Sequence, residues 1–378
     1  MFSNIIEMVK ALPDEKTCRD YLAKARWENG NAVCPYCGYG KCYVIENGKR
    51  YKCGSKTCYR KFSVITGTVF EASNVPLTKW FMAIYLCTAH KKGISSYQLG
   101  RDIKVSQKSA WFMLHRIREL MREKTSDKLD NIVEIDETWV GGKVKNMPKY
   151  KRAKLRTDNN GTAQNKTMVM GMIERGGKLK LIALGKENNS NVLQPLIREN
   201  VDKDAVLMTD TANAYIGINQ DFAGHETVNH ANDEFGRDGV INTNSIEGAF
   251  SLLKRSIIGI YHQVTPKHLS RYCDETMYRY NSRKIKDVER FALSLKNAEG
   301  RLRYVTLTKK DAAISNPLPV HNYPAGTILQ IKDGEIVGTY TKLKEAAQAV
   351  GVNTGTIWKV LKGLKKSSKG YQWKYADK

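Results

Sequence analysis

The stretch IVEIDETWVGG, from Ile132 to Gly142, decides the fold of this chain. Its β-branched and apolar residues predict a strand, which the Gly-Gly pair ends. Asp136 therefore lies inside a strand, where a carboxylate is costly unless something pairs with it or binds it. Glu134 and Asp136 share one face, because strand residues two apart do. That face either meets water or carries a catalytic acid, and this stretch alone leaves both interpretations open.

The charge balance points to a polyanionic partner. The 378 residues are enough for two to four domains, and 62 Lys and Arg oppose 38 Asp and Glu, for a net charge of +24. The excess is spread along the chain, which favours nucleic acid over a membrane surface as the partner. The chain has no run of 18 apolar residues and no signal-peptide pattern at its start. We expect a cytoplasmic protein, nucleoid-associated when it is bound to DNA.

Five of the eight cysteines fall between positions 34 and 58. Two pairs, Cys34-x-x-Cys37 and Cys53-x4-Cys58, flank the hairpin-like segment YVIENGKRYKC. Four thiolates held apart in this way predict one structural zinc ion in a zinc ribbon. Free buried thiols are the alternative, and Cys42 is a spare outside the matched pairs. Lysines and arginines surround the segment, so we also expect this face to contact phosphates.

A pair of helices with a short break follows the ribbon. The segment ISSYQLGRDIKVSQKSAWFMLHRIRELMREK predicts a helix capped by Ser95, a break at residues 103–106 and a second helix. This is a helix-turn-helix pattern. Gln107, Lys108 and Ser109 begin the second helix and are predicted to face the DNA groove. Trp111 is predicted to pack in the core.

The central region adds two further acids to Asp136. Strands and helices are predicted in the order β-β-β-α-β-(β)-α, with Asp210 ending the fourth strand and Glu247 on a later helix. Residues 242–245 are predicted to cap that helix, and Lys254 shares a side with Glu247 because seven residues span nearly two turns. The order is typical of an RNase H-like nucleotidyl-transfer core that holds two divalent metals. Carboxylate oxygens are the ligands that Mg²⁺ requires.

Several further residues are predicted to contact DNA. A basic loop at residues 143–166 contains eight Lys or Arg and one acid. The candidates outside the helix-turn-helix are Lys143, Lys145, Lys254 and Arg255.

The sequence resembles the zinc-ribbon DDE transposases of bacterial insertion sequences, of the ISXO-like type. The resemblance covers roughly residues 20–285 and includes CPYCG, FSVITGTVFEASNVPLTKWF, VEIDETWVGGK, TDTANAY and NTNSIEGAFSLLKR. It implies an RNase H-like fold with Asp136, Asp210 and Glu247 as the acidic triad binding Mg²⁺ or Mn²⁺, followed by Lys254. Asn242 departs from the family pattern, in which His is frequent at this place. His230 is a candidate for a supporting role.

The C-terminal segment predicts a β-hairpin, two helices and a last strand. Its sequence YTKLKEAAQAVGVNTGTIWKVLKG resembles small DNA-binding modules appended to homing endonucleases. The helix pair repeats the earlier one, with Trp358 in the place of Trp111, which again favours a helix-turn-helix.

The chain is therefore expected to be a multidomain α/β protein with six parts. They are an N-terminal helix (1–30), a zinc ribbon (31–68), a helix-turn-helix region (69–128), an RNase H-like core (129–290), a linker (291–321) and a C-terminal DNA-binding module (322–378).

We expect a DDE transposase that binds the terminal inverted repeats of its element and catalyses Mg²⁺-dependent 3′-end cleavage and strand transfer. Its partner is double-stranded DNA, both element ends and target, and cutting two ends suggests a homodimer or a larger assembly. The alternative is a non-catalytic zinc-dependent DNA-binding regulator derived from a transposase. A nuclease on the same core is a third interpretation.

Overall fold

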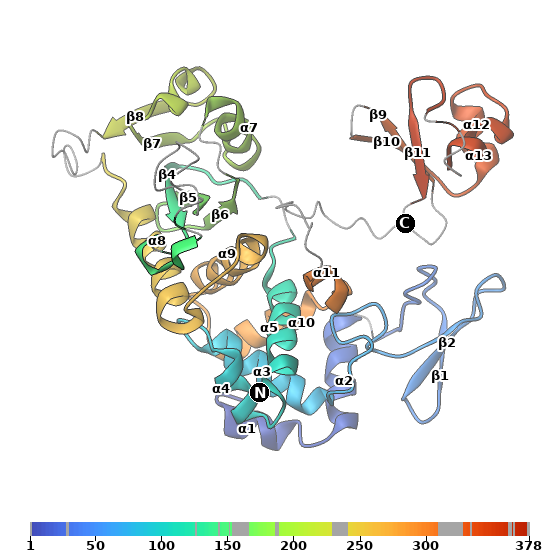
Figure 1. Ribbon diagram of the computed structural model, residues 1–378. Coiled ribbons are helices and arrows are strands. Elements are labelled where there is room, and N and C mark those ends of the chain that lie inside the picture. Colours follow the sequence, from blue (N-terminus) through green and yellow to red (C-terminus); the bar gives the residue numbers. More distant parts are fainter. Residues whose placement is uncertain are drawn as a thin grey trace. The chain divides into compact units, whose positions relative to one another are not determined.

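The chain divides into two units, each built from segments that are distant in the sequence. The computed structural model describes residues 2–27, 30–124, 127–142, 144–150, 152, 166–185, 189–228, 241–308, 328–332, 335–361, 365 and 367–375. One unit comprises Met1–Arg26 and Gly67–Leu318, and the other comprises Trp27–Thr66 and Pro319–Lys378. The first contains a sheet and most of the helices, and the second contains the cysteine-rich segment and the C-terminal segment (Figure 1).

A five-stranded mixed sheet is the centre of the first unit. Its strands are β4 (Ile132–Val140), β5 (Thr167–Glu174), β6 (Leu179–Ala183), β7 (Val206–Asp210) and β8 (Gly224–Val228). They lie in the order β6-β5-β4-β7-β8. β5 is antiparallel to β4 and β6, whereas β7 is parallel to β4 and β8. The strand predicted from IVEIDETWVGG and the predicted order of elements are therefore both observed.

Helices cover both faces of this sheet because both faces are apolar. Met170 of β5 packs in one core with the side chains of α7 (Ser190–Asn200), and its neighbour Val169 packs in the other core with α8 (Asn244–Ser256) and α9 (Pro266–Asn281). Successive strand residues point to opposite faces, which explains this alternation. Polar side chains of the sheet can therefore approach solvent at the ends of the strands. Asp210 lies at such a place, because it is the last residue of β7.

A helical part completes the first unit. Its helices, besides α9, are α1 (Ile5–Ala11), α2 (Glu15–Arg26), α3 (Leu77–Ala89), α4 (Ser96–Asp102), α5 (Gln107–Met121), α10 (Asp287–Lys296) and α11 (Tyr304–Thr308). The predicted cap of α4 is present, because Ser95 Oγ accepts a hydrogen bond from Gln98 N at 3.1 Å. Within the described ranges, no helix has the length and apolar character needed to cross a membrane.

The predicted linker, residues 291–321, begins inside this folded unit. Phe291 and Leu295 of α10 are fully buried, and the Phe291 ring lies 5.6 Å from the rings of both Phe2 and Phe81. Residues four apart share a face of a helix, so this pair continues the core. The boundary predicted at residue 291 is therefore too early, and residues 309–321 lie outside the described residues.

The cysteine-rich segment forms a small antiparallel sheet of β1 (Cys42–Ile45), β2 (Arg50–Cys53) and β3 (Lys61–Phe62). The predicted hairpin is β1 and β2, with Cys42 opposite Cys53. Three aromatic rings pack beside it, with Tyr51 lying 5.0 Å from Trp27 and 5.5 Å from Phe62. A core this small supplies little stability without a metal or disulfides.

The C-terminal segment folds around a core of its own. Its elements are β9 (Ile328–Lys332), β10 (Glu335–Tyr340), α12 (Leu343–Ala349), α13 (Thr354–Leu361) and β11 (Gln372–Tyr375), with the strands in the order β10-β9-β11. This is the predicted order of hairpin, two helices and last strand. Ala346, Ile357 and Trp373 are buried together, whereas Trp358 is 45% exposed. Trp358 therefore presents an aromatic ring at the surface of this segment.

Candidate functional site

Asp136 and Asp210 lie on neighbouring parallel strands. The pairing of β4 with β7 places Glu134 beside Met208. The pairing ends there, and Asp136 and Asp210 each follow two residues later on their own strand, with half-buried side chains. Since residues two apart share a face, Asp136 lies on the face of Glu134, which α8 covers. Two of the predicted acids thus lie on adjacent parallel strands, each two residues beyond the last paired position.

Glu134 anchors α8 to β4. Its side chain is fully buried, so this face of the strand does not meet water there. Glu134 Oε1 accepts a hydrogen bond from Arg175 Nε at 2.6 Å, and Oε2 accepts from the backbone N–H groups of Ser245 at 2.8 Å and Ile246 at 3.0 Å. Amides in the first turn of a helix lack partners within the helix, and the helix dipole favours an anion beside them. The carboxylate therefore fixes where α8 begins.

The predicted cap of α8 by residues 242–245 is only partly correct. Asn242 Oδ1 accepts a hydrogen bond from Asn244 N at 3.3 Å. The N-cap residue Thr243, however, makes no capping hydrogen bond with its side chain, because Glu134 takes the amides of the first turn. Arg175 Nη2 donates to the backbone oxygen of Asn242 at 2.9 Å. Asn242, which departs from the family pattern, is thus held beside the Glu134–Arg175 pair by its backbone.

Gly171 of β5 allows α8 to lie close to the sheet at the level of Asp136. Asp136 of β4 and Gly171 of β5 are directly paired. A Cβ atom on Gly171 would lie 2.6 Å from Ile246 Cδ1 and 2.7 Å from Phe250 Cε1, well inside the optimal carbon–carbon separation of about 3.5–4.0 Å. Glu247 directly follows Ile246, so the close approach positions the first turn of α8 over the Asp136 level.

Glu247 and Lys254 are both exposed, on the side of α8 that faces away from the core. This agrees with the side that their seven-residue spacing predicts. The predicted packing residues are buried, namely Phe250, Leu253 and Ile257. The helix thus presents one acid and one base outward while its other side packs on the sheet.

Sequence reasoning missed a fourth carboxylate, Glu137. Tyr215, which is 1% exposed, donates a hydrogen bond to Glu137 Oε1. Burial raises the pKa of Glu137 to about 7, and the nearby carboxylates of Asp136 and Asp210 add to this effect. The pair ties β4 to the segment that follows Asp210. Two features of the sequence point to the Glu137–Tyr215 pair, namely the acid directly after Asp136 and the tyrosine of TDTANAY.

The acids and the cysteines differ in how closely their ligand atoms gather. Among the described residues, one group of three or more metal-ligating side chains has all its ligand atoms within 4.8 Å of one another, and it consists of the four cysteines. Asp136, Asp210 and Glu247 do not form such a group.

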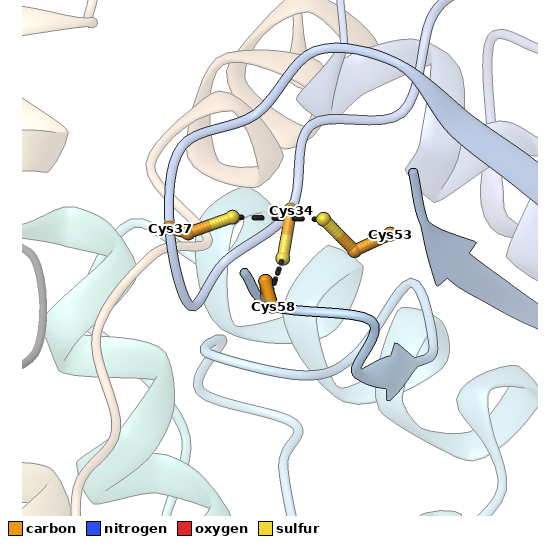
Figure 2. A group of neighbouring side chains, drawn as sticks. All are labelled: Cys34, Cys37, Cys53 and Cys58. Carbon is orange, nitrogen blue, oxygen red and sulfur yellow. Dashed lines mark hydrogen bonds between the residues drawn. The ribbon is translucent and has the colours of Figure 1, made fainter. Parts of the chain in front are cut away.

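The four cysteines form a site that fits zinc. Cys34 Sγ lies 3.8 Å from Cys58 Sγ, and Cys37 Sγ lies 3.6 Å from Cys53 Sγ. Figure 2 shows the four side chains converging from two segments of the ribbon. Tetrahedral ligands about 2.3 Å from zinc would lie roughly 3.8 Å apart, which matches both distances. Cys42 lies outside the group, as predicted.

The predicted groove-facing residues begin α5. Gln107 and Lys108 are exposed, whereas Ser109 is half-buried. Gln107 Nε2 donates to Ser96 Oγ at 2.9 Å, and Lys108 Nζ lies 5.5 Å from the centre of the Tyr304 ring. Both side chains have protein partners, so a DNA contact would have to share or replace these interactions.

The other predicted DNA contacts are described only in part. Lys254 and Arg255 are exposed on α8. Lys143, the side chain of Lys145 and His230 lie outside the described residues.

Comparison with known proteins identifies the family. A transposase zinc-ribbon domain matches residues 13–61, and an ISXO2-like transposase domain matches residues 128–281. An uncharacterized protein in transposable element ISH50 of Halobacterium salinarum is 31% identical over 261 residues, which cover 65% of this chain and 84% of that protein. The chain belongs to the ISXO2-like transposase family. The first domain contains the four clustered cysteines, and the second contains Asp136, Asp210 and Glu247.

The family prediction from sequence is therefore confirmed, as is the zinc ribbon. The crystal structure of a pre-cleavage Mos1 transpososome also matches, with 14% identity over 55% of the transposase and 75% of that chain. The TM-score of 0.21 is too low to support any conclusion from that alignment.

Zinc binding by the ribbon can be tested with two cysteine variants. Reduced wild-type transposase should contain about one zinc ion per chain. Cys53→Ser should lose it because a structural site needs four ligands, whereas Cys42→Ser should keep it. Plasma mass spectrometry of the purified proteins measures the ratio. Zinc-free wild type, or a Cys42→Ser variant that loses its zinc, would contradict the assignment.

Removing the anchor of α8 should destabilise the transposase. Glu134→Ala leaves Arg175 and two helix amides without their acceptor, so the free energy of unfolding should fall by roughly 2–4 kcal/mol. Glu226→Ala, at an exposed strand position, should change it by less than about 0.5 kcal/mol. Urea unfolding followed by circular dichroism compares the two variants. Equal losses would show that Glu134 does not anchor the helix.

Proposed function

We propose that this transposase binds the terminal inverted repeats of its element, cuts the 3′ ends and joins them to target DNA. Asp136, Asp210 and Glu247 are the proposed catalytic triad. The observation that carries the proposal is the anchoring of α8 through Glu134, two residues before Asp136 on the strand that neighbours Asp210. The mixed sheet with β4 between antiparallel β5 and parallel β7 supports an RNase H-like core.

The triad would hold divalent metal ions. Its carboxylate oxygens are the hard ligands that Mg²⁺ or Mn²⁺ takes, and Asp136 and Asp210 lie on adjacent parallel strands. Magnesium bound by these oxygens would polarise the attacking oxygen and stabilise the leaving oxygen. The exposed Lys254, farther along the outward side of α8, would hold a DNA phosphate near the triad as a point charge.

The two chemical steps are displacements of the same kind. In the first, a bond forms between a water oxygen and the phosphorus at the element end, and the bond to the 3′ oxygen breaks. In the second, that 3′ hydroxyl bonds to a target phosphorus, and a target 3′ oxygen leaves. One set of ligands serves both steps, because each is an in-line exchange of oxygens at phosphorus.

The proposed DNA contacts lie on several elements. The net charge of +24 favours binding along the phosphate backbone. The α4–α5 pair would act as a helix-turn-helix, with Gln107, Lys108 and Ser109 toward the bases, and Lys143, Lys145 and Arg255 would contact phosphates. Since two ends must be cut, we further propose that the active assembly is a homodimer or larger.

A zinc-dependent regulator without catalytic activity is the other candidate. Membership of the transposase family does not favour it, and simple DNA binding does not require the carboxylates of Asp136, Asp210 and Glu247. The two functions differ in one measurable property, which is Mg²⁺-dependent cleavage of a duplex that carries the element's end.

Alanine variants of the triad test the catalytic proposal. Asp136→Ala, Asp210→Ala or Glu247→Ala should abolish end cleavage and strand transfer while end binding stays nearly unchanged, because other elements hold the DNA. A double variant should be hardly worse than either single, since residues that act as a unit are non-additive. Lys254→Ala should reduce cleavage only partly. The assay uses an end duplex with Mg²⁺, with binding measured in parallel.

Two outcomes would overturn this assignment. One is cleavage by Asp210→Ala at the wild-type rate. The other is an exchange of roles in which Glu234, which lies outside the described residues, is indispensable and Glu247 is not.

The C-terminal segment, residues 322–378, should bind duplex DNA by itself. It contains ten Lys against four Asp or Glu, and its buried core allows it to fold alone. The logarithm of its affinity should fall linearly with the logarithm of salt concentration as counterions are released. Binding that ignores salt, or no binding, would refute this role.

A further inference from the structure

A cavity of about 630 Å³ lies between the α4–α5 pair and the π-helical turn (Ile257–Tyr261) that continues α8. Its size is within the range of about 300–1,000 Å³ usual for ligand sites. Among the side chains that line it are Arg118, Trp111, Tyr261, Tyr272, Gln107 and His262. Arg118 and Tyr272 are buried, whereas Gln107 and His262 are exposed. The cavity thus has a basic and aromatic interior and a polar opening.

The charge of the interior favours an electron-rich ligand. Arg118 Nε donates to Glu275 Oε2 at 2.7 Å, and Arg279 donates to the same carboxylate. Glu275 thus pairs with two guanidinium groups, of which the buried Arg118 lines the cavity. Arg118 Nη2 is buried without a hydrogen-bond partner, which is unfavourable for a polar group. A ligand that brings an acceptor or a phosphate to Arg118 would give that group a partner.

The chain is strained at the opening of the cavity. His262 has φ 58° and ψ −45°, and Gln263 N donates to Tyr261 O at 2.6 Å. These values define a γ-turn with positive φ at its centre, which is rare and strained for a residue other than glycine. Such strain, like a π-helical turn, occurs mostly at functional sites. The opening therefore has the backbone features of a binding site.

We propose that this cavity takes up one unstacked nucleotide of the element's end. Trp111 is half-buried and would stack on the base, and the Arg118 interior would meet its acceptor atoms or phosphate. Stacking on an aromatic ring offsets the cost of unstacking the base. The inference rests on the proposed function, because it requires that the transposase binds its element's end.

The position of the cavity gives the expected place of that nucleotide. Glu247 lies at the start of α8 and Tyr261 follows fourteen residues later, which spans roughly 21 Å at the helical rise. With about 3.4 Å per nucleotide along a strand, the unstacked nucleotide should lie roughly six nucleotides from the cut phosphate.

A mismatch scan tests the proposal. The full-length transposase is titrated, by fluorescence anisotropy, with duplexes of its element's end that carry one mismatch at each position in turn. A mismatch lowers the cost of unstacking, so one position, about five to seven nucleotides from the cut, should bind roughly tenfold tighter. Trp111→Ala should remove this gain because it removes the stacking ring.

A second variant and a control complete the test. His262→Gly removes the ring at the opening and relieves the positive φ, so it should fold and also lose most of the gain. Tyr304→Ala should keep the gain, because Tyr304 contacts Trp111 but does not line the cavity. The proposal is overturned if no position binds tighter, or if the gain persists in His262→Gly. Should the unmodified end be neither bound nor cut, the proposed function fails as well.

Discussion

The architecture of this transposase depends on one buried carboxylate, Glu134. A charge removed from water costs several kcal/mol unless its hydrogen bonds are complete, and here Arg175 and two helix amides complete them. Replacing such a pair with apolar residues is often neutral for stability, so the main effect of the Glu134–Arg175 pair is to fix the position of α8. An apolar contact would let α8 slide along the sheet, whereas directional hydrogen bonds hold its first turn at one place on β4.

The other end of α8 is held by a second buried carboxylate, Glu275. Tyr261, at the end of the π-helical turn, donates to Glu275 Oε1 at 2.5 Å, and Arg118 of α5 donates to Oε2. Burial alone would raise the pKa of Glu275, but Arg118 and Arg279 outweigh it and lower the pKa to about 2. The carboxylate is therefore charged at neutral pH and links α5 to the end of α8. A rotation of α5 would strain these bonds, so the helices that we propose bind DNA are mechanically joined to the helix that carries Glu247.

The structural features that could be predicted from the sequence are those that depend on local pattern and spacing. β4 follows from a run of β-formers, the cysteine cluster from two paired spacings, and the side shared by Glu247 and Lys254 from helical periodicity. The partners of Glu134 were not predictable, because Arg175 lies 41 residues and Ser245 lies 111 residues farther along the chain. These residues meet Glu134 only when the sheet and the helix pack together. The same limit hid the Glu137–Tyr215 hydrogen bond. Phe291 and Leu295 are a different case, because their spacing indicates a helix, whereas the irregular sequence that follows them favours a linker.

The way each part is stabilised determines which parts of the chain are separable. Four cysteines around one metal site hold the ribbon, and Ala346, Ile357 and Trp373 give the C-terminal segment a core of its own. Each of these two parts thus has its own source of stability. The helical part differs, because its Arg118 pairs with Glu275 of α9, and α9 packs on the sheet. Removing α5 would leave a buried carboxylate without one of its two cations, at a cost of roughly 3–5 kcal/mol. The α4–α5 pair and the acid-bearing sheet therefore stabilise one another within one folding unit.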